Sequence, residues 1–220
     1  GEVKTAEVMH QAGKWYLSVT VECDPQRSAG NKAVGVDWGL ETFATVVDPD
    51  GVNNPISNPR FLDKTQRQRL KTLQQAVSRK TNKRSNRRRK AVKALAAEHG
   101  KIANRRRDFL HQTSARLVSQ CGLIATEKLN VKGMTAQGGE YKKGLNRSIL
   151  DTAPSTFLKL LKCKAEEAGI EWVEVPTRTV KPSQTCHRCG IQRKKPLSER
   201  QHVCACGAAC SRDENAARVM

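Results

Sequence analysis

The sequence predicts an α/β fold that is interrupted by one basic helical hairpin and followed by a small cysteine-rich module. Three observations predict it. Strand-like runs alternate with helical ones, the periodicity becomes helical over residues 59–120, and five of the eight cysteines fall in the last 35 residues. The 220 residues are enough for one large domain, or for a core domain with a small module.

The chain opens with two β-rich runs, Glu2–His10 and Lys14–Glu22. The short segment 11–13 between them ends in a glycine, so we expect an antiparallel hairpin. Residues 23–31, which contain a proline and a glycine, are predicted to form a linker.

Two further strands are expected at Ala33–Asp37 and Thr42–Val47, with a turn at Gly39 between them. The tetrapeptide Asp48-Pro49-Asp50-Gly51 is a strong turn signal and ends the second strand.

From about Phe61 the apolar residues recur at helical spacing, first at Leu70, Leu73 and Val77. A polar break at 78–86 follows. A longer apolar stripe then runs through Val92, Leu95, Ile102, Phe109, Leu110 and Leu117. Two amphipathic helices with a short connection are expected to form an antiparallel hairpin, with the basic side chains on its outer faces and at its tip.

Most of the formal net charge of +19 lies on this hairpin. Residues 64–107, the basic arm, hold 17 Lys and Arg and a single acid, Glu98, whereas the remaining residues carry only +3. A merely solvated helix would mix both signs, so the arm indicates a polyanionic partner, namely nucleic acid. The alternative, a coiled-coil oligomerisation arm, would bring +16 against +16. The basic side chains expected to contact nucleic acid are Lys80, Lys83, Arg84, Arg87, Arg88, Arg89, Lys90, Arg105 and Arg106.

After the arm, Leu123–Glu127 is predicted to be a short apolar strand that ends on an acid. The glycine-rich segment Lys132–Arg147 has weak periodicity and is interpreted as a mobile loop. Asp151 is expected to cap a helix over 151–168, and a strand follows at Ile170–Val175.

Composition excludes two classes of protein. No apolar run approaches the roughly 20 residues of a transmembrane helix. Gly1–Val8 lacks the basic and apolar regions of a signal peptide, which favours a cytoplasmic location. Clustered thiols without a signal peptide favour metal binding in a reducing compartment over a disulfide framework.

The cysteine spacing predicts a structural zinc site. Cys186-x2-Cys189 and Cys204-x-Cys206 can supply four thiolates from two tight turns, and a glycine follows the second cysteine of each pair. Four thiolates leave no open position, so this zinc would not be catalytic.

The second pair is one residue shorter than usual, which leaves the ligand set open. Cys210 could replace Cys204 or Cys206, and His187 and His202 are weaker substitutes. Free or disulfide-bonded cysteines are the alternative to a metal site.

Three acids lie in contexts that favour chemistry. Asp37 is on an uncharged, buried-looking strand, Glu127 ends the apolar strand, and Asp213 opens a predicted final helix at Ser211–Met220. Carboxylates gathered from separate elements repel each other and are tolerated when a hard divalent cation neutralises them. Two Mg²⁺ ions there could cleave a phosphodiester. For Asp213 the structural alternative is an N-terminal helix acid.

Several longer motifs occur in the order of a known family. They are Gly35-Val36-Asp37-Trp38-Gly39-Leu40, Asn58-Pro59-Arg60-Phe61-Leu62, Ile102-Ala103-Asn104-x-Arg106-x-Asp108-Phe109-Leu110-His111, Glu127-Lys128-Leu129-Asn130-Val131-Lys132-Gly133-Met134, Asn146-Arg147-Ser148-Ile149-x-Asp151, Pro182-Ser183-Gln184-Thr185-Cys186-His187-Arg188-Cys189-Gly190, and Cys206-Gly207 with Arg212-Asp213-Glu214-Asn215-Ala216-Ala217. Through them the chain resembles the TnpB (OrfB) proteins of insertion sequences, which are RuvC-like nucleases related to type V CRISPR effectors.

The resemblance implies a ribonuclease H-like (RuvC) mixed sheet, with Asp37, Glu127 and Asp213 as catalytic, metal-binding acids for two Mg²⁺ or Mn²⁺ ions. It implies a transposon-associated, RNA-guided DNA endonuclease of prokaryotic nucleoids. A zinc-binding module for the target nucleic acid precedes the last acid, and the partners are a DNA target and a guide RNA. The helical hairpin would lie along the RNA–DNA heteroduplex, and 132–147 would form a lid over the acids.

The implied boundaries are the end of a wedge β-barrel at 1–30, a nuclease domain at 31–181 with the hairpin insertion 59–120, a zinc module at 182–210 and a last helix at 211–220. Three features depart from the family pattern: Pro154, the shortened cysteine pair, and the absence of most of the upstream wedge and recognition region. The piece alone is therefore expected to bind nucleic acid loosely and not to be a complete guided nuclease.

Two other functions are weighed against this one. An inactive nucleic-acid-binding relative or transposition regulator is expected to lack at least one acid, yet all three are present. A cut-and-paste transposase of the same fold usually ends its acid set with Glu, whereas this chain has Asp213.

Overall fold

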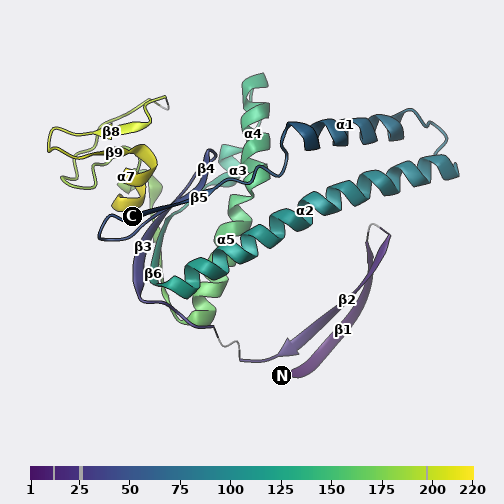
Figure 1. Cartoon of the computed structure of the whole chain (residues 1–220), viewed down its shortest axis with the longest axis horizontal. Helices are drawn as coiled ribbons and strands as arrows, with labels where there is room; N and C mark the ends of the chain where they lie inside the picture. Colours follow the sequence, from purple (N-terminus) through teal and green to yellow (C-terminus); the bar gives the residue numbers. More distant parts are fainter. Residues whose placement is uncertain (12, 25–26, 197) are drawn as a thin grey trace. The chain divides into compact units, whose positions relative to one another are not determined.

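The fold comes from a computed structural model that describes residues 1–11, 13–24, 27–196 and 198–220 (Figure 1). The chain divides into two compact units. The first comprises residues 1–26 and 60–109, and the second comprises residues 27–59 and 110–220. No helix in the described ranges combines the length and the apolar character needed to cross a bilayer.

In the first unit, β1 (Glu2–Gln11) and β2 (Lys14–Glu22) pair as the predicted antiparallel hairpin. Both strands are exposed along their whole length. The predicted turn at 11–13 includes residue 12, and the predicted linker at 23–31 includes residues 25–26, so both fall partly outside the described residues.

The predicted helical hairpin is confirmed as α1 (Lys64–Ser78) and α2 (Asn86–Gln120). The Asp63 side chain caps α1 by accepting a hydrogen bond of 2.7 Å from the backbone N–H of Gln66. The two helices are joined by an ion pair of 3.1 Å between Arg69 and Glu98.

The apolar stripe of α2 differs from its prediction in two places. Val92 is 40% exposed, whereas the acid Glu98 is only 5% exposed. The single acid of the basic arm is therefore turned inward, where Arg69 pairs with it. Because that negative charge is buried and paired, the outer surface of the arm is left to cations.

The second unit is built on one five-stranded mixed sheet in the order β5-β4-β3-β6-β7. The strands are β3 (Lys32–Trp38), β4 (Thr42–Val47), β5 (Asn53–Ser57), β6 (Cys121–Glu127) and β7 (Glu171–Val175). β3, β4 and β5 pair antiparallel, whereas β3–β6 and β6–β7 pair parallel. The sheet confirms the predicted α/β class.

The turn after β4 forms as predicted, but the strand that follows it was missed. The Asp48 side chain accepts a hydrogen bond of 2.8 Å from the Val52 N–H, and Gly51 takes a φ of 83°. β5 then pairs with β4 and includes Pro55. A proline inside a run argues against a central strand, but it is tolerated here because β5 lies at the sheet edge.

The prediction of a mobile loop at Lys132–Arg147 is wrong. This segment contains α3 (Val131–Met134) and the first part of α4 (Glu140–Thr152). The glycines of this segment made a helix look unfavourable, but Gly144 is the only one of them that lies within α4. The Asn146 side chain also donates a hydrogen bond of 3.0 Å to the Thr135 carbonyl, which ties α4 to the end of α3.

Asp151 does not cap a helix over 151–168. It lies near the end of α4 and is buried, and α5 (Pro154–Ala168) begins three residues later. Ala153, with a φ of 49°, separates the two helices, and Pro154 starts α5 at a position where a missing N–H costs little. Downstream of α5, the turn at Gly169 and the strand β7 agree with the prediction.

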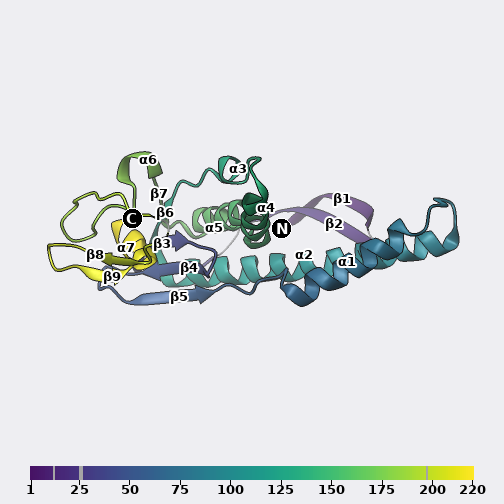
Figure 2. The same ribbon diagram turned by 90° about the horizontal axis from the view of Figure 1, so that it is seen from above.

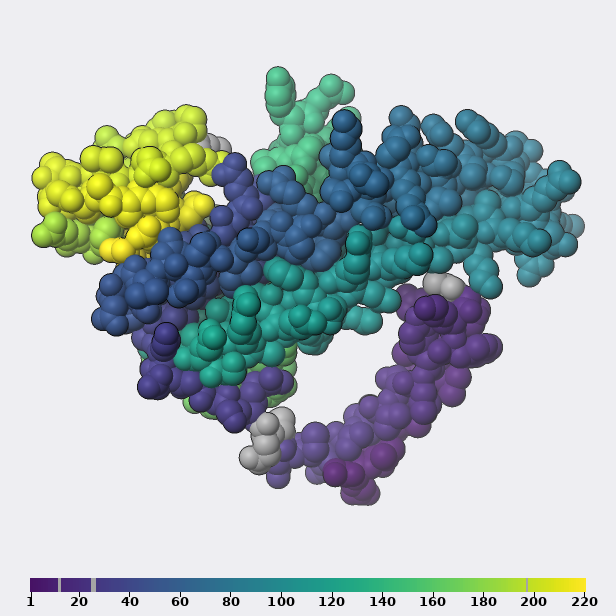
Figure 3. All heavy atoms as spheres, viewed as in Figure 1, coloured from purple at the N-terminus to yellow at the C-terminus, as the bar shows by residue number. Residues whose placement is uncertain are grey.

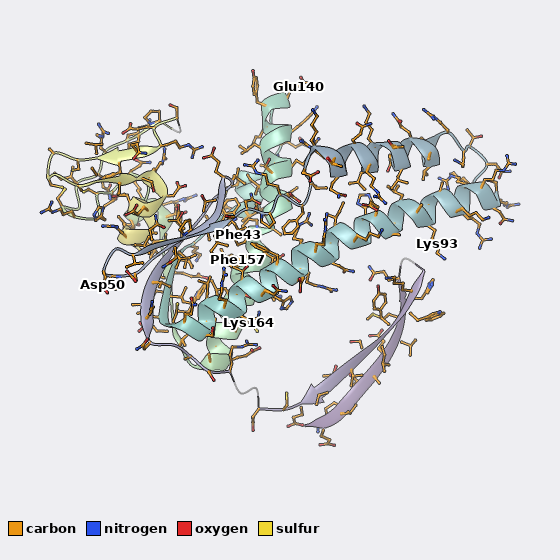
Figure 4. The ribbon with its side chains drawn as sticks, viewed as in Figure 1. Phe43, Asp50, Lys93, Glu140, Phe157 and Lys164 are labelled. Carbon is orange, nitrogen blue, oxygen red and sulfur yellow. The ribbon has the colours of Figure 1, made fainter. Side chains whose placement is uncertain are left out.

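Side chains of α5 anchor the core of the second unit (Figure 4). The rings of Phe157 and Phe43 lie edge to face with centroids 4.8 Å apart, and neither ring reaches solvent. The buried Lys164 ammonium donates to the His111 carbonyl at 2.5 Å and to the Ser114 hydroxyl at 2.8 Å, which fastens α5 to the last turns of α2.

The last helix, α7 (Arg212–Val219), lies directly against β3 and β4 (Figure 2). It follows α6 (Thr177–Val180) and a small ribbon of β8 (Gln201–Val203) and β9 (Ala209–Ser211). A Cβ on Gly35 of β3 would lie 1.9 Å from the carbonyl oxygen of Ala217. Only a glycine lets the helix backbone come this close to the sheet.

We expect Gly35→Ala to lower the free energy of unfolding by about 3 kcal/mol, because backbone must move to admit the added methyl group. Denaturant unfolding monitored by circular dichroism would measure this change.

Gly144→Ala is the matched control. Its added methyl group meets nothing within 4 Å, and it lies inside α4, so we expect a gain of about 0.5–1 kcal/mol. Equal effects of the two substitutions would contradict the close packing of α7 on β3.

Candidate functional site

Two of the predicted acids are brought together by the parallel pairing of β3 and β6. Gly35 pairs with Ala125 and Val36 with Thr126, so the strands are in register as they approach their carboxyl ends. Asp37 lies two residues after Gly35 on β3, and Glu127 lies two residues after Ala125 on β6. Since side chains two residues apart share a face of a sheet, both acids lie on the face that carries Gly35.

The third acid reaches the same face from α7. Asp213 is four residues before Ala217, and residues four apart lie on one side of a helix. Ala217 lies against Gly35, so Asp213 is one helical turn along α7 on the side that meets the sheet. The Ser211 hydroxyl caps the helix by accepting a hydrogen bond of 3.1 Å from the Glu214 N–H.

The other two acids act electrostatically on Asp37. Burial raises the pKa of Asp37 well above its ordinary value, and the charges of Asp213 and Glu127 raise it further. Arg212 acts in the opposite direction and lowers the pKa of Asp37. The carboxylate oxygens of the three acids are not gathered within 4.8 Å of one another among the described residues.

Glu127 has a neighbour, Thr177, that was not predicted as a site residue. Burial raises the pKa of Glu127, and the neighbouring Thr177 side chain acts in the opposite direction and lowers it. The Thr177 hydroxyl donates its proton to the Lys128 carbonyl at 2.9 Å. Thr177 thus holds the end of β6, from which Glu127 projects.

A second cluster is formed by four thiols. The sulfur atoms of Cys186, Cys189, Cys204 and Cys206 all lie within 4.8 Å of one another. The Sγ atoms of Cys186 and Cys206 are 3.7 Å apart, and those of Cys189 and Cys204 are 3.6 Å apart. The glycine after each pair has a positive φ, 72° at residue 190 and 87° at residue 207, so both turns need glycine.

The thiols fit a cation. Burial opposes ionisation of Cys186, but hydrogen bonds from two backbone groups and from His202 lower its pKa to about 5. For Cys189, a backbone hydrogen bond favours the thiolate, yet desolvation and the neighbouring thiols raise the pKa to about 12. One thiolate therefore forms readily and further negative charge is resisted, as expected for donors that need a positive ion among them.

Of the residues considered as substitute zinc ligands, the two histidines lie near the thiols and Cys210 does not. Cys210 lies outside the four-thiol cluster, with a pKa raised by burial. His187 and His202 do lie close to the thiols, since a ring nitrogen of each is within 4.8 Å of the Cys186 sulfur. His202 is buried and contacts the ammonium of the equally buried Lys195 through Nδ1.

Asn215 joins the two clusters and was not predicted as a site residue. It lies on α7 two positions after Asp213 and is completely buried. Its side chain makes hydrogen bonds to the segment 182–187, which leads into the first cysteine pair. In Figure 3 the atoms of the C-terminal residues, yellow-green to yellow on the colour bar, form one continuous mass.

Seven of the nine predicted nucleic-acid contacts lie at one end of the helical hairpin, whereas Arg105 and Arg106 lie farther along α2. Lys83 and Arg84 lie exposed in the connection, and Arg87–Lys90 form the first turn of α2, which contains no acid. Two of the predicted residues have partners within the chain. Lys80 donates to the Ala76 carbonyl at 2.7 Å, and the Arg106 guanidinium lies 5.6 Å from the centre of the Phe61 ring.

Sequence comparisons find relatives that are named as RNA-guided DNA endonucleases. The chain is 36% identical over 210 residues to a protein of Streptomyces pristinaespiralis named "Putative RNA-guided DNA endonuclease". This alignment covers 94% of the present chain and 49% of the relative. The chain is 33% identical over 217 residues to "Putative RNA-guided DNA endonuclease InsQ" of Escherichia coli K12, covering 93% and 52%. The chain thus spans about half the length of these relatives.

A structural comparison agrees on the fold. A chain of the "CRISPR-Cas12f Ternary Complex", solved by cryo-electron microscopy, superposes with a TM-score of 0.62 at 17% identity, covering 92% of this chain and 41% of that one. The description "Cas12f1-like, TNB domain" matches residues 155–220. The description "Probable transposase" of the OrfB_IS605 family matches residues 16–137, more than half of the chain. The chain therefore belongs to the OrfB family of transposon proteins.

Proposed function

We propose that the chain is the nuclease portion of an RNA-guided DNA endonuclease, and that Asp37, Glu127 and Asp213 are its catalytic acids. The observation that carries this proposal is the convergence of three carboxylates, from β3, β6 and α7, on one face of the sheet. The pKa of Asp37 is raised by both of the other acids, so the three charges share one electrostatic environment. The names of the relatives support the substrate class and the partners, namely target DNA and guide RNA.

The topology supports a ribonuclease H-like, RuvC-type domain. Three antiparallel strands are followed by two parallel ones, in the order β5-β4-β3-β6-β7, and two of the acids sit at the carboxyl ends of the neighbouring central strands. On this assignment residues 31–181 and the last helix form the nuclease domain. The hairpin 59–120 is inserted into that domain, and residues 1–30 are the end of a wedge barrel.

The acids fit Mg²⁺ or Mn²⁺. Their donor atoms are carboxylate oxygens, which these hard cations prefer, and their mutual repulsion is what a divalent cation would relieve. Two bound cations would supply an activated water and would stabilise the leaving oxygen of a phosphodiester. Asp37 would hold the central position, because both other acids act on it.

The neighbouring residues set the charge balance of the site. Arg212 lowers the pKa of Asp37, so it favours the ionised carboxylate that a cation needs. Thr177 acts in the same direction on Glu127 and lowers its pKa. Both residues therefore work against the burial that would otherwise keep these two acids protonated.

The four-thiol cluster would hold one structural Zn²⁺ in a ribbon-like module at 182–210. Two tight turns that present four mutually adjacent sulfurs are the arrangement a tetrahedral zinc requires. With all four positions filled by thiolates the ion would stabilise the fold and would not touch substrate.

The basic arm would bind the phosphate backbone of the heteroduplex. Cations are normally unfavourable at a helix N-terminus, which already carries a partial positive charge, yet α2 begins with Arg87, Arg88, Arg89 and Lys90 and no acid. Such a helix start is stabilised by an external anion, and phosphate fits these basic side chains. These contacts would hold a strand without reading its sequence.

Replacement of Asp37 by Ala is expected to reduce Mg²⁺- or Mn²⁺-dependent cleavage of single-stranded DNA by about a thousandfold, since metal-assisted stabilisation is worth several kcal/mol. Binding of the same DNA should persist, because the basic arm is unchanged. A gel-based cleavage assay with a parallel binding assay would measure both quantities. Asp50→Ala, in the exposed turn between β4 and β5, is the control and should retain cleavage; equal activity of all three chains would refute the assignment.

Asp37→Asn is expected to stabilise the fold in buffer free of Mg²⁺ and Mn²⁺. Because the folded-state pKa of Asp37 is raised, ionisation weakens the unaltered chain. Below about pH 3.9, the ordinary pKa of Asp, both chains carry a neutral side chain and should match. As the pH rises through the folded-state pKa, only the unaltered chain should lose stability. Melting temperatures from pH 4 to 8 would show this, and Mg²⁺ should then raise the Tm of the unaltered chain alone.

Joint replacement of Arg88 and Arg89 by Gln is expected to weaken DNA binding and to reduce the slope of log K against log salt by about 2, since two phosphate contacts are lost. The matched control is Lys159→Gln with Lys162→Gln, two exposed cations on α5 outside the arm. Fluorescence anisotropy over a salt series would give both slopes. Identical slopes for the two double variants would contradict the proposed role of the arm.

A further inference from the structure

Asn215 makes every hydrogen bond that its side chain can make, and all of them reach one segment. Its Oδ1 accepts from the backbone N–H of His187 at 3.1 Å and from the ring Nδ1 of His187 at 3.0 Å. Its Nδ2 donates to the carbonyl of Thr185 at 2.7 Å and to that of Pro182 at 3.3 Å. An amide with two acceptor positions and two N–H donors has nothing left unpaired.

The orientation of this amide is fixed by its partners. Two carbonyl oxygens can only accept, so the NH₂ group must face Pro182 and Thr185, and the oxygen must face His187. Asn215 is 0% exposed, so no water can replace a partner that moves away.

Arg212 ties the start of α7 to the other half of the cysteine module. Its backbone N–H donates to the Arg200 carbonyl at 2.8 Å, and its guanidinium donates to the Pro196 carbonyl at 2.8 Å. Asp213 lies between Arg212 and Asn215, so the helical turn that carries the third acid is held to the module on both sides.

We propose that Asn215 is a positioning residue that couples the metal in the four-thiol cluster to metal binding by Asp37, Glu127 and Asp213. The inference rests on the proposed function, because it takes these three acids as the nuclease site. Asn215 touches neither the thiols nor the acids through its side chain. It acts by fixing the segment 182–187 to the helix that presents Asp213.

The coupling has a direct physical cause. A cation among the four thiols removes their mutual repulsion and fixes the turn from Cys186 to Cys189, and His187 lies within that turn. When the cation leaves, the turn can shift, and the buried amide of Asn215 then loses partners that water cannot supply. The first turn of α7 must move to recover them, and Asp213 moves with it. Because such coupling is reciprocal, metal at the acids should also tighten the module.

The test measures Mn²⁺ binding by electron paramagnetic resonance, with and without zinc, in the unaltered chain and in Asn215→Ala. Mn²⁺ reports on the carboxylate site because it prefers oxygen ligands to thiolates. Zinc is removed with a zinc-selective nitrogen-donor chelator, and zinc content is measured on every sample. Asn215→Asp, which keeps the shape but loses both N–H donors, serves the same purpose should Asn215→Ala fail to fold.

We expect Asn215→Ala to retain one zinc per chain, since its four thiols are intact, and to bind Mn²⁺ about tenfold more weakly, as is typical when an outer support of a metal site is lost. Zinc removal should weaken Mn²⁺ binding to a similar degree in the unaltered chain and should add little in Asn215→Ala, because both changes break the same connection. Equal effects of zinc removal in the two chains would overturn the inference, as would Mn²⁺ binding that neither change alters.

Lys164→Met is the matched control for a general loss of stability. Lys164 is also a buried polar residue of the second unit, but its hydrogen bonds join α5 to α2 and not α7 to the cysteine module. The Lys164→Met variant should melt at a lower temperature than the unaltered chain, while its Mn²⁺ affinity should still fall when zinc is removed. If Mn²⁺ affinity depends on Asn215 and on zinc as expected but the unaltered chain cleaves no DNA, the proposed nuclease function is contradicted and the proposed coupling still stands. Absence of Mn²⁺ binding in the unaltered chain would refute both.

Discussion

The contact between the backbone of α7 and Gly35 is the constraint on which the candidate site depends. Two of the acids are delivered by strand pairing alone, because β3 and β6 run parallel and in register. The third comes from a helix that no strand pairing positions, and it arrives at the right depth because residue 35 has no side chain. The same contact places Asp213 beside Asp37, where its charge raises the pKa of that residue.

Three places in this chain concentrate groups that would bind a partner of opposite charge: the three acids, the four thiols and the basic start of α2. In both the acid cluster and the thiol cluster, neighbouring groups oppose the ionisation of one member, whereas the first turn of α2 concentrates cations where the helix itself disfavours them. The acid Glu98, which could have balanced the arm, is instead buried and paired with Arg69.

Much of the fold follows from local pattern. Short apolar runs bounded by turn residues predicted β3, β4 and β6, and apolar residues at helical spacing predicted α1 and α2. The sequence-based prediction missed elements that contain residues usually unfavourable in helices or strands. Glycines concealed α4, and a proline concealed β5, whose position at the sheet edge is a tertiary fact. The three acids could be chosen from their contexts, but Asn215 could not, since its importance lies in hydrogen bonds to residues about 30 positions away.

The position of α7 in the chain order has a consequence for the timing of activity during synthesis. The arm and two carboxylates lie within residues 37–127, but the third acid is reached only at residue 213. On the proposed assignment, a nascent chain that stops before α7 would carry the nucleic-acid-binding arm but only two of the three acids. Placing the last acid so late would then let a growing polypeptide bind nucleic acid before it could cleave it.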